Sequence, residues 1–100
     1  MARTKMPKTE MNYRQVAQDD FLKEVDSRCV WAGYRTNEAL GKAVGVTGRT
    51  IGNHKQEPGK MKVEVLQGLV KTLQLSPVVV LRYLGYSTQD IRKFAKEYIQ

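Results

Sequence analysis

Apolar residues recur at three- and four-residue steps through most of the chain, and glycine or proline interrupts each run. The clearest run lies in residues 63–73, where valine and leucine side chains fall on one face of a helix. No segment shows strand-like alternation of comparable strength, and the chain has no internal repeat. One hundred residues are enough for one domain with a modest core. The sequence therefore predicts an all-α fold in a single domain.

The same periodicity divides the chain into three regions. Residues 1–15 lack an apolar face and are expected to form a flexible basic arm. A helical domain is predicted over 16–86, with helices beginning near residues 16, 36, 47, 63 and 78 and ending near 33, 44, 55, 73 and 84. An amphipathic C-terminal helix is predicted over 87–100. The segment 78–84 is apolar on most faces, so it is expected at the centre of the core.

Capping residues support several of these boundaries. Thr36 and Thr47 are candidate N-caps, because a threonine hydroxyl accepts a hydrogen bond from a free N–H group of the first turn. Ser76 followed by proline is a typical helix start, and Ser87 with Asp90 has the spacing of a capping box.

The charge of the chain is positive and unevenly distributed. Lysine and arginine number 17 against 10 acidic residues, which gives a formal net charge of +7. The basic excess lies in residues 1–15 and 36–62, whereas the segment between them carries Asp19, Asp20, Glu24 and Asp26. Two separate basic regions favour binding to a polyanion.

Composition also predicts where the protein works. There is no long apolar run and no apolar segment behind the basic N-terminus, so neither a membrane span nor a signal peptide is expected. The single cysteine, Cys29, has no partner for an intrachain disulfide, and we expect it to be a small core residue. These features favour a cytoplasmic protein.

Residues 36–76, TNEALGKAVGVTGRTIGNHKQEPGKMKVEVLQGLVKTLQLS, have the pattern of two short helices around a tight turn and a leucine-rich helix behind them. Gly41 is the small residue where the short helices would touch, and Gly45 is the glycine of the turn. The apolar residues that would lock the angle between the helices are Leu40, Val44, Val46 and Ile51.

This stretch resembles the Cro and lambda-repressor type of helix-turn-helix proteins from phages and bacteria. Gly41 and His54 depart from that family, which usually has alanine and an isoleucine or tryptophan at these places. The resemblance implies a lambda-repressor-like five-helix domain, here with a sixth helix. It also implies a sequence-specific transcriptional regulator that binds double-stranded DNA. On this resemblance we expect a phage or mobile-element repressor that acts in the bacterial cytoplasm.

Roles for individual residues follow from groove chemistry. If Ile51 points into the core, helical geometry sends Arg49, Asn53 and Gln56 to the opposite face. Arginine pairs with guanine, and asparagine or glutamine with adenine. The predicted base-reading residues are Thr47, Arg49, Thr50, Asn53 and Gln56. The predicted phosphate contacts are Thr36 and Asn37, where the family meets the DNA backbone, together with Lys55, Lys60, Lys62, Arg3, Lys5 and Lys8.

The C-terminal helix is the candidate dimer seam. One recognition helix reads only a few base pairs, so half-sites one helical turn apart require a two-fold protein. The apolar face expected to form this seam consists of Ile91, Phe94, Tyr98 and Ile99. The alternative is that this face folds back to cover residues 78–84.

Two other classes of function compete with DNA binding. An enzyme is not expected, because one histidine, one cysteine and scattered carboxylates give no metal-ligand cluster and no nucleophile–base pair. No cofactor or metal is therefore predicted. The remaining rival is a protein-binding inhibitor or antirepressor on the same scaffold, whose partner the sequence does not identify.

Overall fold

The computed structural model describes residues 8–98, with the side chains of residues 13–97. This part of the chain contains no strand, and the all-α prediction is confirmed. The helices are α1 (Lys8–Ala32), α2 (Asn37–Val44), α3 (Gly48–Gln56), the short 3-10 helix η1 (Pro58–Lys60), α4 (Val63–Leu73), α5 (Pro77–Tyr83) and α6 (Thr88–Tyr98). None of the described helices is long and apolar enough to cross a membrane.

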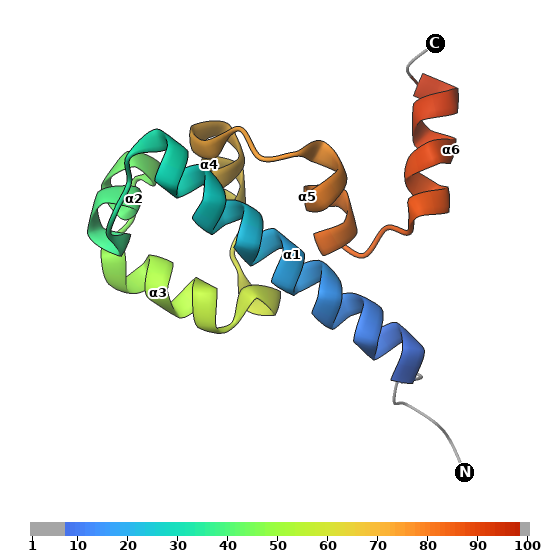
Figure 1. The fold of residues 1–100 in the computed structure, drawn as a ribbon, viewed down its shortest axis with the longest axis horizontal. Coiled ribbons are helices and arrows are strands. Elements are labelled where there is room, and N and C mark those ends of the chain that lie inside the picture. Colours follow the sequence, from blue (N-terminus) through green and yellow to red (C-terminus); the bar gives the residue numbers. More distant parts are fainter. Residues whose placement is uncertain (1–7, 99–100) are drawn as a thin grey trace.

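The long helix α1 is the frame of the molecule. It runs diagonally across the view, with α2, α3 and α4 around its C-terminal half and α5 beside its middle (Figure 1). One stripe of α1 is buried at four-residue steps and consists of Ala17, Phe21, Val25 and Cys29. Phe21 is fully buried and stacks on the ring of Tyr83 from α5, with ring centroids 4.3 Å apart. The prediction of Cys29 as a core residue is confirmed.

The first helix begins earlier than the sequence predicted. It starts at Lys8 and not near residue 16, so residues 8–15 are helical, which corrects that part of the predicted flexible arm. The side chains of Tyr13, Arg14 and Gln15 are exposed, and Tyr13 is 71% exposed. Residues 8–15 do contain good helix formers and neither glycine nor proline, which is sufficient to continue the helix from the buried part of α1.

The prediction for the fifth helix was wrong about its depth. Helix α5 has no buried residue, and Val78 is 49% exposed. Val79, Val80 and Tyr83 pack against the core from one side. The other side of α5 remains open because α6 turns away from it, so an apolar helix lies at the edge of the core.

Helices α2 and α3 touch through their backbones. A Cβ atom added to Gly41 would lie 2.6 Å from the carbonyl oxygen of Val46. Gly45 ends α2 with a left-handed backbone, φ 98°, as predicted for the turn glycine. Leu40 and Ile51 are 1% and 2% exposed and fill the space behind the turn. Burying each of these side chains stabilises the fold by about 1.5–3 kcal/mol.

Helix α6 stands apart from the rest of the molecule. It follows α5 through a short turn and extends away from α1 and α4 (Figure 1). Its start is the predicted capping box, in which Ser87 and Asp90 exchange two hydrogen bonds of 3.1 Å. Phe94 makes an edge-to-face contact with Tyr86, and none of the described side chains of α6 is buried. The helix therefore does not fold back over α5.

Replacing Gly41 by alanine should destabilise the protein, although alanine is the better helix former. The added methyl group would meet the backbone of the turn, which cannot rotate away. We expect the free energy of unfolding to fall by about 1–3 kcal/mol. Denaturant unfolding followed by circular dichroism measures this, with Lys42→Ala on the exposed side of α2 as the control. An unchanged midpoint for Gly41→Ala would contradict the close helix contact.

Candidate nucleic-acid interface

The outward face of α3 carries polar side chains with no packing role. Ile51 is buried, and Arg49, Asn53 and Gln56 are exposed, as the helical geometry predicted. Thr50 is half-buried on the flank of this face. Helix α3 has no acidic residue, so its exposed side is basic and amide-rich. Arginine and amide side chains together supply both hydrogen-bond donors and acceptors to whatever approaches.

Both short helices have the predicted threonine caps. The hydroxyl of Thr36 accepts a hydrogen bond of 3.1 Å from the backbone N–H of Ala39. The hydroxyl of Thr47 accepts one of the same length from the N–H of Thr50, and the two threonine hydroxyls are 2.9 Å apart. Each cap fixes where its helix begins, which matters for short helices that are marginal alone. Thr47 therefore has a structural role, whatever else it contacts.

The two glycines of α3 differ in how closely other parts of the protein approach them. A Cβ atom on Gly48 would lie 2.9 Å from the backbone N and Cα of Glu38, so this glycine permits the contact with α2. A Cβ atom on Gly52 would meet only the Nδ2 atom of Asn37, at an ordinary 3.5 Å. Packing within the protein therefore explains Gly48 and does not explain Gly52.

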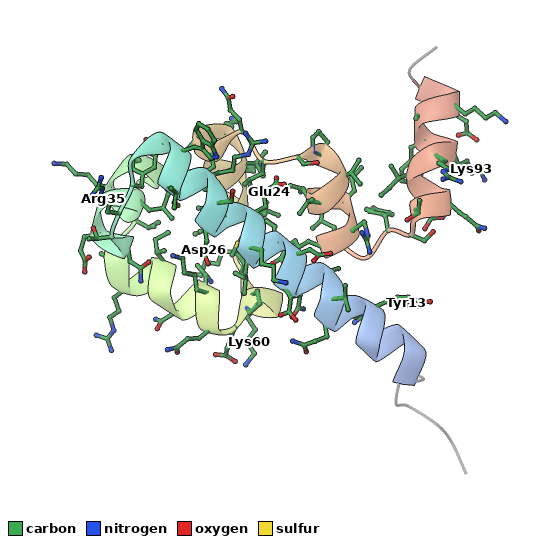
Figure 2. All side chains as sticks on the ribbon, viewed as in Figure 1. Tyr13, Glu24, Asp26, Arg35, Lys60 and Lys93 are labelled. Carbon is green, nitrogen blue, oxygen red and sulfur yellow. The ribbon has the colours of Figure 1, made fainter. Side chains whose placement is uncertain are left out.

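Lys55 points inward and not toward the outward face. It follows Ile51 by one helical turn, so the two side chains share a side of α3. Its ammonium group donates a hydrogen bond of 2.9 Å to Oδ1 of Asn37 and lies 3.6 Å from the Asp26 carboxylate. Figure 2 shows Asp26 on α1 where this helix passes α3. The phosphate contact of Lys55 stays a prediction, and in this structure the side chain is engaged within the protein.

The other predicted cations lie at the surface. Lys60 is exposed at the end of η1, where it pairs with Glu57 at 3.1 Å, and Lys62 is exposed just before α4. An exposed pair of this kind contributes little to stability and exchanges readily. Arg35 was not predicted; it is exposed directly before Thr36 and points away from the molecule (Figure 2). Arg3, Lys5, the Lys8 and Tyr98 side chains and Ile99 lie outside the described residues.

Several acidic residues of α1 form hydrogen bonds or ion pairs within the protein. Glu24 accepts a hydrogen bond from the backbone N–H of Ser76, at the start of α5. Ser76 is the N-cap residue of α5, but its side chain does not make the predicted cap hydrogen bond. Asp26 faces Lys55, and Asp19 accepts a hydrogen bond from Gln15. Two acidic residues of the segment, Glu24 and Asp26, thus connect α1 to α5 and α3.

Residues with reactive side chains have packing roles. Burial raises the pKa of the Cys29 thiol, and the nearby Lys55 only partly opposes this, so the thiol stays protonated near neutral pH. His54 lines the same small cavity as Phe21, Leu22 and Met61, and its Nε2 atom is buried with no hydrogen-bond partner among the described residues. Within residues 8–98, no group of three histidine, cysteine, aspartate or glutamate side chains is placed to hold a metal ion.

The sequence interpretation missed the group formed by Asp26, Asn37 and Lys55. A signal for part of it was present, since Lys55 is four residues after Ile51 and so belongs to the inward side of α3. The same geometry that placed Arg49 outward places Lys55 inward. Asp26 gave no such signal, because its position opposite α3 depends on how α1 crosses the molecule.

Comparisons of the chain with protein-family models, with curated proteins and with solved structures gave no match.

The two glycines of α3 should respond in opposite ways to alanine. Gly52→Ala should raise the free energy of unfolding by about 1 kcal/mol, because the methyl group meets no obstacle and alanine favours the helix. Gly48→Ala should lower it, because the methyl group would press on the backbone of α2. Urea unfolding of both variants beside the parent protein tests this. If Gly52→Ala were the destabilising change, packing would require both glycines.

Proposed function

We propose that the protein is a sequence-specific double-stranded DNA-binding transcriptional regulator of the phage or mobile-element repressor type. In this proposal α2 and α3 form a lambda-repressor-like helix-turn-helix, and α3 enters the major groove. One observation carries the proposal: α3 exposes Arg49, Asn53 and Gln56 together, beside a glycine that packing does not need. The resemblance of residues 36–76 to that family supports it independently.

Each exposed residue of α3 has a suitable target on a base edge. Arg49 would donate two hydrogen bonds to O6 and N7 of guanine, and Asn53 would pair with N6 and N7 of adenine. Gln56 would make the same contact near the helix end. Gly52 would let the backbone of α3 approach the groove, at a cost of about 1 kcal/mol in helix propensity. Thr50 is suited to a thymine methyl group or a phosphate.

Residues around α3 would hold the DNA backbone. Thr36, Asn37 and Arg35 lie together at the start of α2, and Lys60 and Lys62 lie beyond the end of α3. Contacts of this kind fix the register of a protein on the duplex without reading its sequence. The basic N-terminal residues would add to them. The net charge of +7 supports a polyanion as partner.

The protein would act as a homodimer through α6. Ile91 and Phe94 are half-buried on a helix that extends away from α1 and α4 (Figure 1). Helix α6 is strongly amphipathic, with charged residues on the side opposite these two. A second copy would cover this apolar face and set the spacing of the two recognition helices.

Arg49 and Asn53 should affect recognition differently from Lys60. Arg49→Ala or Asn53→Ala should weaken binding to the preferred duplex by about 1–3 kcal/mol and change binding to random DNA much less. Lys60→Ala should weaken both about equally and reduce the salt slope by roughly one unit, because every site carries the same phosphates. Titrations on a duplex selected from a random pool, repeated at several salt concentrations, measure these effects.

Melting temperatures of these three variants serve as the control, and they should stay near that of the parent because all three side chains are exposed. Equal weakening on every sequence would mean that α3 holds DNA without reading it. Absence of salt-dependent DNA binding in the parent protein would favour the protein-binding module.

Removing residues 87–100 should leave a folded monomer with weakened DNA affinity. Helix α6 buries none of its described side chains, so the core does not depend on it. Sedimentation and circular dichroism of the truncated and full chains measure mass and helicity. Loss of the folded state would show that α6 covers the core in solution, and an unchanged dimer mass would place the seam elsewhere.

A further inference from the structure

The side-chain amide of Asn37 has a defined orientation. Its Oδ1 atom accepts the hydrogen bond of 2.9 Å from the Lys55 ammonium group. An ammonium group has no lone pair and can only donate, so it selects the oxygen and never the nitrogen of an amide. The Nδ2 atom is therefore on the other side of the amide. That side faces the backbone of Gly52, where an added Cβ atom would be 3.5 Å away.

We propose that Lys55 is a positioning residue, which turns the Nδ2 donors of Asn37 toward a DNA phosphate at the junction of α2 and α3. This inference rests on the DNA-binding function proposed above and deepens it. A phosphate oxygen only accepts hydrogen bonds, so Asn37 can serve it only through Nδ2. Lys55 fixes that orientation from inside the protein, and the phosphate approaches from outside.

The position of Lys55 separates this role from a direct phosphate contact. Its side chain is 33% exposed and is engaged by Asp26 as well as by Asn37. The Asp26 carboxylate offsets the lysine charge, which weakens its attraction for a phosphate. Polarisation acts in the other direction: a charged donor on Oδ1 makes the Nδ2 hydrogens of the same amide better donors.

Gly52 completes the arrangement. The Nδ2 atom lies over a residue with no side chain, so an incoming phosphate oxygen meets no Cβ atom there. An alanine at this position would be tolerated by the protein and would place a methyl group beside the donor. Gly52 and Lys55 therefore act on the same amide, one by leaving space and the other by fixing direction.

The test is a double-mutant cycle between Lys55→Met and Asn37→Ala. It uses the full-length protein and the duplex enriched by the parent protein from a random pool. Each single variant should weaken binding roughly tenfold, as expected for loss of a hydrogen bond to a charged group. The double variant should be no weaker than either single variant. The salt slope should stay unchanged in all three, because no cation leaves a phosphate.

Asp26→Asn is the matched control, because it removes the same ion pair from Lys55 and keeps the bond to Asn37. Its affinity for the duplex should stay within about twofold of the parent, while its melting temperature should move as much as that of Lys55→Met. If affinity simply follows stability, Asp26→Asn will lose binding too, and the positioning role is wrong. A separate readout without DNA is the Asn37 side-chain amide resonance, which should shift in Lys55→Met and much less in Asp26→Asn.

Four further results would overturn the inference. A salt slope lower by about one unit in Lys55→Met would mean that the lysine contacts phosphate itself. Losses that multiply in the double variant would make the two residues independent. Full DNA affinity in Asn37→Ala would mean that Asn37 does not contact a phosphate. If the parent protein still binds DNA in that case, the proposed function is unaffected. A parent protein that binds no duplex would overturn both proposals.

Discussion

The backbone contact between α2 and α3 is the constraint on which the rest of this structure depends. Gly41 leaves out a Cβ atom where α2 meets the backbone of the turn before α3, and Gly48 leaves one out where α3 meets α2; the added atoms would lie 2.6 and 2.9 Å from their nearest neighbours. A contact between backbones leaves little freedom in the angle between two helices, because there are no side chains to adjust. Leu40 and Ile51 then complete the unit by filling the space behind the turn. The direction of every side chain on α3 follows from this contact.

The order of α3 comes from its neighbours and not from its own sequence. A helix of nine residues with two glycines would be marginal in isolation. Here Thr47 caps its start, Ile51 anchors its middle, and Lys55 ties its last turn to α1 and α2. These three residues lie at four-residue steps along one side. The opposite side contributes almost nothing to folding, so its residues can be chosen for what they bind.

The elements that sequence predicted correctly are those set by local rules. Helix type, the caps at Thr36 and Thr47, and the capping box at Ser87 depend on residues within one turn of each other. The predictions that were wrong depended on how elements far apart in the sequence pack together. The apolar residues of α5 predicted a central helix, but how much of α5 is buried depends on the position of α6. The start of α1 was misplaced because apolar periodicity marks the buried part of a helix and not its full length.

The candidate site divides in the same way. The exposure of Arg49, Asn53 and Gln56 followed from the single assumption that Ile51 is buried. Lys55 was assigned by its charge, although the same assumption placed it on the inward side. Basic residues near a recognition surface therefore fall into two kinds. Some extend into solvent, as Arg35 and Lys60 do, and others, such as Lys55, bond to groups within the protein. The net charge of +7 counts both kinds equally.

That distinction changes how the charge of such a domain should be interpreted. An inward lysine with an acidic and an amide partner adds little to the field that attracts a polyanion. It still affects an interface, because an ammonium group fixes the direction of any amide that it contacts. Orienting an amide in this way requires no exposed charge, and it cannot be detected from amino-acid composition. In the proposed complex, where α3 meets the DNA, an inward contact that orients an outward donor would connect the core of the domain to its surface.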